Sequence, residues 1–226
     1  MVGRDEPVAL APAPPRYVSR AGEKLHAALA GFGVPVEGRR ALDVGSSTGG
    51  FTDCLLQHGA ASVVAVDTGR HQLHEKLRHD PRVTVHERTD IRRLAPPLLG
   101  GPADIVTVDV SFTSLRLVLP GALALSVPAA DLVALVKPQH EAPRPVVSQG
   151  RGIVRDPEVW AAVLETTTGT LRTLGAAIMG AMVSPLHGAD GNVEFLVHAL
   201  APGHGRGDLG TIDAAALAAA PRRGDR

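Results

Sequence analysis

Lysine is scarce in this 226-residue chain, and two lysines occupy positions where an amine could take part in proton transfer. Only three of the 23 basic residues are lysines. Lys24 follows Ser19 on an expected first helix, and Lys137 ends the apolar run 132–136 just before Pro138. Arginine does not lose its proton in a protein, whereas the pKa of lysine responds to burial and neighbouring charge. A lysine kept at a strand end in an arginine-rich chain therefore indicates acid–base chemistry.

Aspartates stand at the ends of the other predicted parallel strands. Short apolar runs alternate with helical segments along the chain, which is typical of parallel strands joined by helices. The strands expected at 41–44, 62–66, 83–85, 105–108 and 132–136 carry, at or near their carboxyl ends, Asp43, Asp67, Asp90, Asp109 and Lys137. Ligands bind outside the carboxyl ends of such sheets. The sequence therefore predicts a site at this edge.

The remaining elements complete an α/β fold. Helices are expected to begin near residues 19, 51, 72, 115 and 156, and two last strands, 176–183 and 193–199, read as a closing hairpin. We predict a Rossmann-like, mostly parallel seven-stranded sheet with helices on both faces and a closing antiparallel hairpin. The third lysine, Lys76, falls on the helix 72–79 and is expected to face solvent. Residues 1–16 read as a flexible leader, 17–200 as the folded domain and 201–226 as a loose tail.

The composition of the chain limits the classes of protein to which it can belong. The formal net charge is zero, so RNA binding would have to rest on local arginine patches, such as Arg144, Arg151 and Arg155 beside Lys137. The single cysteine, Cys54, excludes an intramolecular disulfide and a cysteine-based zinc cluster, and we expect no metal site. The chain shows neither a signal-peptide layout nor an apolar stretch long enough to span a membrane, which favours a cytoplasmic protein.

A glycine-rich turn, Gly45-Ser-Ser-Thr-Gly-Gly50, follows the first strand. It is not a P-loop, because no lysine follows the last glycine, and it lacks the second glycine of the dinucleotide fingerprint, where Ser47 stands. The surrounding carboxylates favour a ligand with cationic groups and a ribose. Asp67 is placed to accept from ribose hydroxyls, and Asp90 from an adenine amino group. S-adenosylmethionine combines these features.

Several longer motifs resemble one family, the TlyA proteins, which are also known as haemolysins and belong to the FtsJ-like RNA ribose 2′-O-methyltransferases. The resemblance extends in order from residue 17 to about residue 200. It implies the class I methyltransferase fold and S-adenosylmethionine as cofactor. The matching stretches are Tyr17-Val-Ser-Arg-Ala-Gly-Glu-Lys24, Leu42-Asp-Val-Gly-Ser-Ser-Thr-Gly-Gly-Phe-Thr52, Asp80-Pro-Arg-Val83, Glu87-Arg-Thr-Asp90, Val108-Asp-Val-Ser-Phe112, Val136-Lys-Pro-Gln139 and Gly191-Asn-Val-Glu-Phe195.

The family's catalytic tetrad of lysine, aspartate, lysine and glutamate falls on Lys24, Asp109, Lys137 and Glu194. The resemblance implies that Lys137 takes or steers the proton of the acceptor hydroxyl. It implies further that Asp109 and Lys24 hold this hydroxyl in place, while Glu194 balances the lysine charges. The cofactor residues that it implies are Asp43, Gly45, Ser46, Ser47, Thr48, Gly49, Phe51, Asp67 and Asp90.

Two departures from the family pattern leave the acceptor open. TlyA proteins usually begin with a small RNA-binding domain, which we do not expect within residues 1–16, and His140 stands where the family tends to have phenylalanine. One hypothesis is a methyltransferase acting on ribosomal or other structured RNA. The alternative is a tailoring enzyme that methylates a small-molecule hydroxyl, or that catalyses a dehydration or cyclisation. A membrane-lytic role has no amphipathic basic helix to support it. The sequence does not indicate an oligomeric state.

Overall fold

The computed structural model describes residues 14–94 and 100–203, with residues 205, 207, 208, 212, 216 and 217. Its centre is a seven-stranded sheet in the order β3-β2-β1-β4-β5-β7-β6. The strands are β1 (Arg40–Val44), β2 (Ser62–Val66), β3 (Val83–His86), β4 (Ala103–Val108), β5 (Ser126–Val136), β6 (Ala177–Val183) and β7 (Phe195–Leu200). β1 to β5 pair in parallel, and β7 is antiparallel to both β5 and β6. The predicted sheet and closing hairpin are therefore confirmed.

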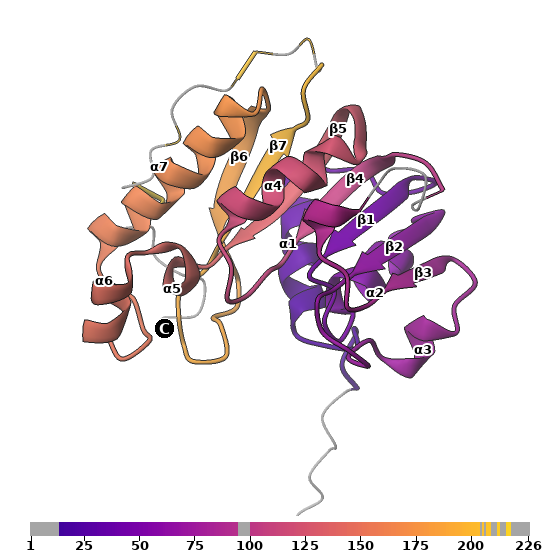
Figure 1. The fold of residues 1–226 in the computed structure, drawn as a ribbon, viewed down its shortest axis with the longest axis horizontal. Helices are drawn as coiled ribbons and strands as arrows, with labels where there is room; N and C mark the ends of the chain where they lie inside the picture. The colour runs from indigo at the N-terminus through magenta and orange to yellow at the C-terminus, as the bar shows by residue number, and fades with distance from the viewer. Residues whose placement is uncertain are drawn as a thin grey trace, which may run out of the picture.

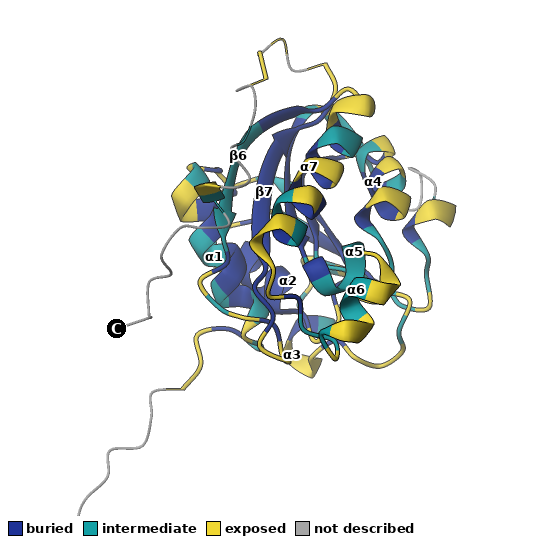
Figure 2. Ribbon diagram, turned by 90° about the vertical axis from the view of Figure 1, so that its left-hand side faces the viewer, coloured by how far each residue is buried: buried dark blue, intermediate teal, exposed yellow. Residues whose placement is uncertain are grey.

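Helices cover both faces of the sheet (Figure 1). α1 (Ala21–Phe32) and α2 (Gly50–Gln57) pack on one face, and α4 (Leu115–Ala124) and α7 (Pro157–Thr173) on the other. Figure 2 shows β7 buried between these two layers, the edge strand β6 mostly of intermediate burial, and exposed residues on the outer sides of the helices. The shorter helices are α3 (Glu75–Arg78), η1 (Ile91–Arg93), α5 (Pro138–Glu141) and α6 (Arg144–Gln149).

Three segments differ from the sequence prediction. Residues 138–149, where no helix was predicted, contain α5 and α6, and each of these helices carries a proline in its first turn, where a missing N–H costs no hydrogen bond. The helix expected at 72–79 is reduced to the four residues of α3. β5 begins at Ser126 rather than at residue 132, and its pairing with β4 shifts register between Ala103 and Ile105. Most of the predicted leader and tail lies outside the described residues.

The sheet register decides which residues meet at the carboxyl edge. Val44 pairs with both Val66 and Val108, so the residues that follow these three strands lie side by side. On the other side of β4, Val136 pairs with Phe195, which places Lys137 next to Glu194. α5 and α6 lie at this end of the molecule (Figure 1). None of the helices among the described residues has both the length and the apolar character to cross a membrane.

Candidate functional site

Two lysine–carboxylate ion pairs lie at the carboxyl edge of the sheet. Lys137 Nζ is 2.5 Å from Asp109 Oδ1, and Lys24 Nζ donates a hydrogen bond of 2.5 Å to Glu194 Oε2. Glu194 is 2% exposed and Lys24 is 8% exposed, so the second pair is buried. Lys137 follows and Glu194 precedes the last register pair of β5 and β7, Val136 with Phe195, which brings the two ion pairs to the same place at the edge of the sheet. Four segments that are distant in sequence thus supply one polar site.

The contact between Lys137 and Asp109 is mainly ionic. Asp109 Oδ1 is buried and has no partner with hydrogen-bond geometry, although the Lys137 ammonium lies 2.5 Å away. Lys137 Nζ instead donates a regular hydrogen bond of 2.9 Å to Ser111 Oγ. The ammonium is therefore held between a carboxylate and a hydroxyl that are two residues apart.

Sequence reasoning missed two polar residues of this site. Ser111 bonds Lys137, and Gln139 Nε2 donates to Glu194 Oε1 over 3.3 Å. The Gln139 Oε1 atom is buried and has no partner among the described residues, which leaves an acceptor beside the ion pairs. Both residues stand two positions beyond a member of the predicted tetrad. This position, two residues after Asp109 and after Lys137, was the feature of the sequence that could have indicated them.

The glycine turn is built to lie close to the Asp109 backbone. Gly45 has φ +85°, and a Cβ atom there would overlap the carbonyl oxygen of Asp109. The N–H groups of Gly45 and Ser46 both donate to Val66 O, at 2.8 and 3.2 Å. Ser47 has φ 46°, and its N–H donates to Asp67 Oδ2 at 2.8 Å. Only glycine suits position 45, where a positive φ and a close contact coincide.

Two clefts open on either side of this turn. The larger has a volume of about 520 Å³ and includes Gly45, Ser47, Asp67, Asp90, Asp109 and Ser111 in its lining. The smaller, of about 140 Å³, includes Ser19, Ser46, Thr48, Phe51 and Lys137. Gly45, Ser47, Asp109 and Ser111 line both clefts and form the wall between them. Of the predicted cofactor residues, Asp43 and Gly49 line neither cleft.

Asp43 lies beneath the turn and not at the edge of the sheet. It is the fourth residue of β1, so its side chain points onto a face of the sheet, where Thr52 Oγ1 donates over 2.6 Å and Thr107 Oγ1 over 3.0 Å. Burial is the main cause that raises its pKa to about 7, against the lowering effect of the two hydroxyls. Asp43 therefore lies apart from both clefts, with its carboxylate bonded by the two hydroxyls.

Asp43→Asn is expected to change how stability depends on pH. A carboxyl group whose pKa rises from 3.8 to about 7 on folding stabilises the fold most below about pH 4, and this contribution is lost as pH rises to about 7. Asparagine does not titrate, so the variant does not lose stability in this way. Its free energy of unfolding should therefore rise relative to that of the wild type between pH 4 and 8. The gain is on the order of 4 kcal/mol. Urea unfolding across this range measures it, and parallel curves for the two proteins would contradict it.

Besides Asp109, two acidic residues line the larger cleft, Asp67 and Asp90, and they differ in the groups that bond their carboxylates. Asp67 accepts one N–H on each oxygen, from Ser47 at 2.8 Å and from Gly69 at 2.6 Å, and each oxygen keeps a second lone pair. Asp90 forms an ion pair of 2.5 Å with the Arg92 guanidinium. This contact is the main cause that lowers the pKa of Asp90 to about 2. Asp67 is therefore the better acceptor for a ligand.

The third lysine also has a carboxylate partner. The Lys76 side chain is 63% exposed, as expected, but its Nζ lies 3.3 Å from Asp53 Oδ1. Within the described ranges, no group of three or more histidine, cysteine or acidic side chains is arranged to hold a metal ion.

Most of this chain is similar in sequence to known proteins. The family model of the FtsJ-like methyltransferases matches residues 17–200. YqxC of Bacillus subtilis is 49% identical over 206 residues, covering 91% of this chain and 73% of the relative. The 16S/23S rRNA (cytidine-2′-O)-methyltransferase TlyA of Mycobacterium tuberculosis is 47% identical over 181 residues, covering 80% of this chain and 67% of the relative.

Solved structures extend the likeness to the fold. A hemolysin-like protein of Lactococcus lactis superposes with a TM-score of 0.85 at 41% identity, over 90% of this chain and 97% of the other. Methyltransferases at 14–19% identity superpose with TM-scores of 0.53–0.58, which shows a shared Rossmann-like fold. The match over residues 17–200 and these relatives show that the chain belongs to the FtsJ-like methyltransferase family.

Proposed function

We propose that this protein transfers the methyl group of S-adenosylmethionine to a ribose 2′-hydroxyl of structured RNA, with ribosomal RNA as the first candidate. One observation carries the proposal. The Lys137–Asp109 pair lies where two clefts adjoin, the larger of which has a volume of about 520 Å³. In methyl transfer the attacking oxygen and the donor methyl group must come within about 3–3.5 Å, so the donor and acceptor sites must adjoin, as these two clefts do.

The residues of the larger cleft fit S-adenosylmethionine. Asp67 would hold the ribose hydroxyls, because its oxygens keep lone pairs after accepting two N–H groups. Gly45 would allow close approach of the ligand's amino-acid part, since no side chain intervenes between the turn and Asp109. When bound, the cofactor supplies an electrophilic methyl group on a sulfonium. Of the other predicted cofactor residues near the turn, Ser47 lines this cleft as well, whereas Ser46, Thr48 and Phe51 line the smaller cleft beside it.

On the acceptor side, we assign the two ion pairs a role in proton transfer. A ribose hydroxyl is a weak nucleophile, and its proton must be taken or steered away as the oxygen attacks. We assign this to Lys137, which Asp109 and Ser111 hold in one orientation. Glu194, bonded to both Lys24 and Gln139, balances the lysine charge next to it. The four residues then act as one unit on the acceptor hydroxyl.

Features around the site suit an RNA acceptor. Phe112 is 95% exposed at the larger cleft, has φ +62°, and its ring centroid lies 5.3 Å from that of His140. A bulky residue in this backbone region is held there by its surroundings, and an exposed ring offers a planar base a stacking surface. Arg144, Arg151 and Arg155 are exposed, and none forms an ion pair with another described residue. Such guanidinium groups bind phosphates. An rRNA acceptor would place the enzyme in the cytoplasm.

The function is tested with radiolabelled S-adenosylmethionine and ribosomal subunits from a host that lacks this protein. We expect label in the RNA with the wild-type protein. If no RNA is labelled although the donor binds tightly, the RNA proposal is wrong. Label in a small-molecule extract instead would establish the alternative acceptor.

Asp67→Ala is expected to weaken donor binding more than it slows the methyl-transfer step. The variant loses the carboxylate that would hold the ribose and also the acceptor for the Ser47 N–H. We expect the Kd for S-adenosylhomocysteine to rise by about 10²-fold, the effect of losing two charge-assisted hydrogen bonds. Calorimetry measures it, with Glu158→Ala on α7 as a control of equal charge change. An unchanged Kd would remove Asp67 from the donor site.

A further inference from the structure

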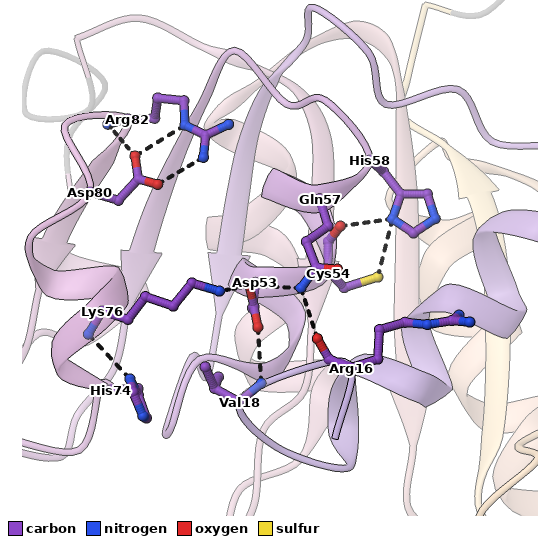
Figure 3. Close-up of polar contacts among 10 residues, drawn as sticks. All are labelled: Arg16, Val18, Asp53, Cys54, Gln57, His58, His74, Lys76, Asp80 and Arg82. Carbon is purple, nitrogen blue, oxygen red and sulfur yellow. Dashed lines mark hydrogen bonds and ion pairs between the residues drawn. The ribbon is translucent and has the colours of Figure 1, made fainter. Parts of the chain in front are cut away.

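A buried carboxylate outside both clefts accepts hydrogen bonds from the two segments that flank the glycine turn. Asp53 lies on α2, and its side chain is only 3% exposed. Figure 3 shows it between Val18 of the N-terminal segment and Lys76 of α3. Val18 N–H donates to Oδ2 at 2.9 Å, and Lys76 Nζ donates to Oδ1 at 3.3 Å. One side chain of α2 therefore bonds the segments on either side of it.

The N-terminal segment (residues 16–19) forms one border of the smaller cleft, which Ser19 lines. Gln57 Nε2 donates both to Arg16 O at 2.9 Å and to Asp53 Oδ1 at 3.1 Å, which fixes the segment a second time. The segment also packs against the start of α2. A Cβ atom at Gly50 would overlap Ser19 Oγ. A shift of the segment would therefore change both the cleft and the end of the turn.

α3 and the residues just before it hold the other side of the turn. His74 N–H donates to Thr48 O at 3.1 Å. A Cβ atom at Gly49 would overlap the Leu77 side chain, so this residue packs directly on the turn. Because Lys76 belongs to the same short helix, its ion pair with Asp53 fixes α3 against α2. The donor turn is thus enclosed by two segments that meet at one carboxylate.

We propose that Asp53 is a positioning residue for the methyl donor, acting by holding residues 16–19 and α3 against the turn 45–50. The inference rests on the proposed function, since it concerns the affinity of the same donor. Asp53 lines neither cleft, so it acts through the segments that it bonds. Its two oxygens accept from donors on opposite sides. An amide in its place has one acceptor, so it cannot serve both sides.

The test is the affinity of Asp53→Asn for S-adenosylhomocysteine, measured by calorimetry on the full chain. We expect Kd to rise about tenfold, as for the loss of one hydrogen bond to a charged group, with kcat at saturating donor within about twofold of wild type. Asp80→Asn is the matched control. Asp80 also accepts from a basic side chain, Arg82 at 2.7 Å, but this bond is local, within two residues (Figure 3).

Lys76 gives a second variant that does not endanger the fold, since most of its side chain is exposed. Lys76→Met should raise Kd severalfold by freeing α3, and Lys76→Arg should restore it because the charge is kept. If Asp53→Asn does not fold, the Lys76 pair decides the question. Kd values within twofold of wild type for every folded Asp53 and Lys76 variant would overturn the proposal, and so would equal weakening by Asp80→Asn. A wild-type protein that binds no S-adenosylhomocysteine would instead overturn the proposed function.

Discussion

Lys137→Ala is expected to abolish methyl transfer while it leaves donor affinity close to that of wild type. The side chain lies between Asp109 and Ser111 and lines the smaller cleft, but it does not line the larger cleft that we assign to the donor. Loss of a positioned acid–base group typically lowers the rate by about 10²–10⁴-fold. Single-turnover transfer to RNA gives the rate, and calorimetry with S-adenosylhomocysteine gives the affinity. A collapse of donor binding would contradict the role.

Lys137→Arg separates charge from proton acceptance. The variant keeps a cation beside Asp109, but a guanidinium does not give up its proton at neutral pH. We expect it to be nearly as slow as Lys137→Ala. An arginine variant with wild-type activity would show that positive charge suffices, and the proton-accepting role would be wrong.

Lys24→Met is expected to destabilise the protein and to stop transfer. It leaves the Glu194 carboxylate, 2% exposed, without its ammonium partner and with only the Gln139 amide at 3.3 Å among the described residues. Breaking a buried ion pair on one side costs about 3–5 kcal/mol, because an uncompensated charge stays buried. Denaturant unfolding measures the loss. A change below about 1 kcal/mol would mean that the pair is effectively solvated.

The double variant Lys24→Met with Glu194→Leu distinguishes stability from catalysis. Replacing both partners by apolar side chains removes the buried charge, so most of the lost stability should return. Transfer should stay absent, because the charge balance beside Lys137 is not rebuilt. If transfer returned together with stability, the Lys24–Glu194 pair would be structural only.

The alternation of strands and helices was sufficient to predict the edge of the sheet at which the site lies. Asp67, Asp109 and Lys137 follow their strands directly, so parallel pairing alone places them there. Asp43 differs from these residues, because it lies one residue before the end of β1 and its carboxylate is buried against Thr52 and Thr107, outside both clefts. The end of this strand was predicted correctly, at Val44, but the burial of Asp43 depends on Thr52 and Thr107, which come from other segments.

Contacts between distant segments could not be derived from local patterns. Lys24 and Glu194 are 170 residues apart, and only the family resemblance connected them before the structure did. Asp53 was unremarkable in sequence, since one aspartate on an amphipathic helix is usually solvent-exposed. Its burial depends on Val18 and Lys76, which come from two other segments.

The most direct test of the central claim identifies the atom that is methylated. Ribosomal RNA labelled by the wild-type protein is digested to nucleosides and separated by chromatography with mass spectrometry. The account predicts label in a 2′-O-methylnucleoside with the wild-type protein and none with Lys137→Ala. Label on a base, or equal label from the Lys137→Ala variant, would contradict it.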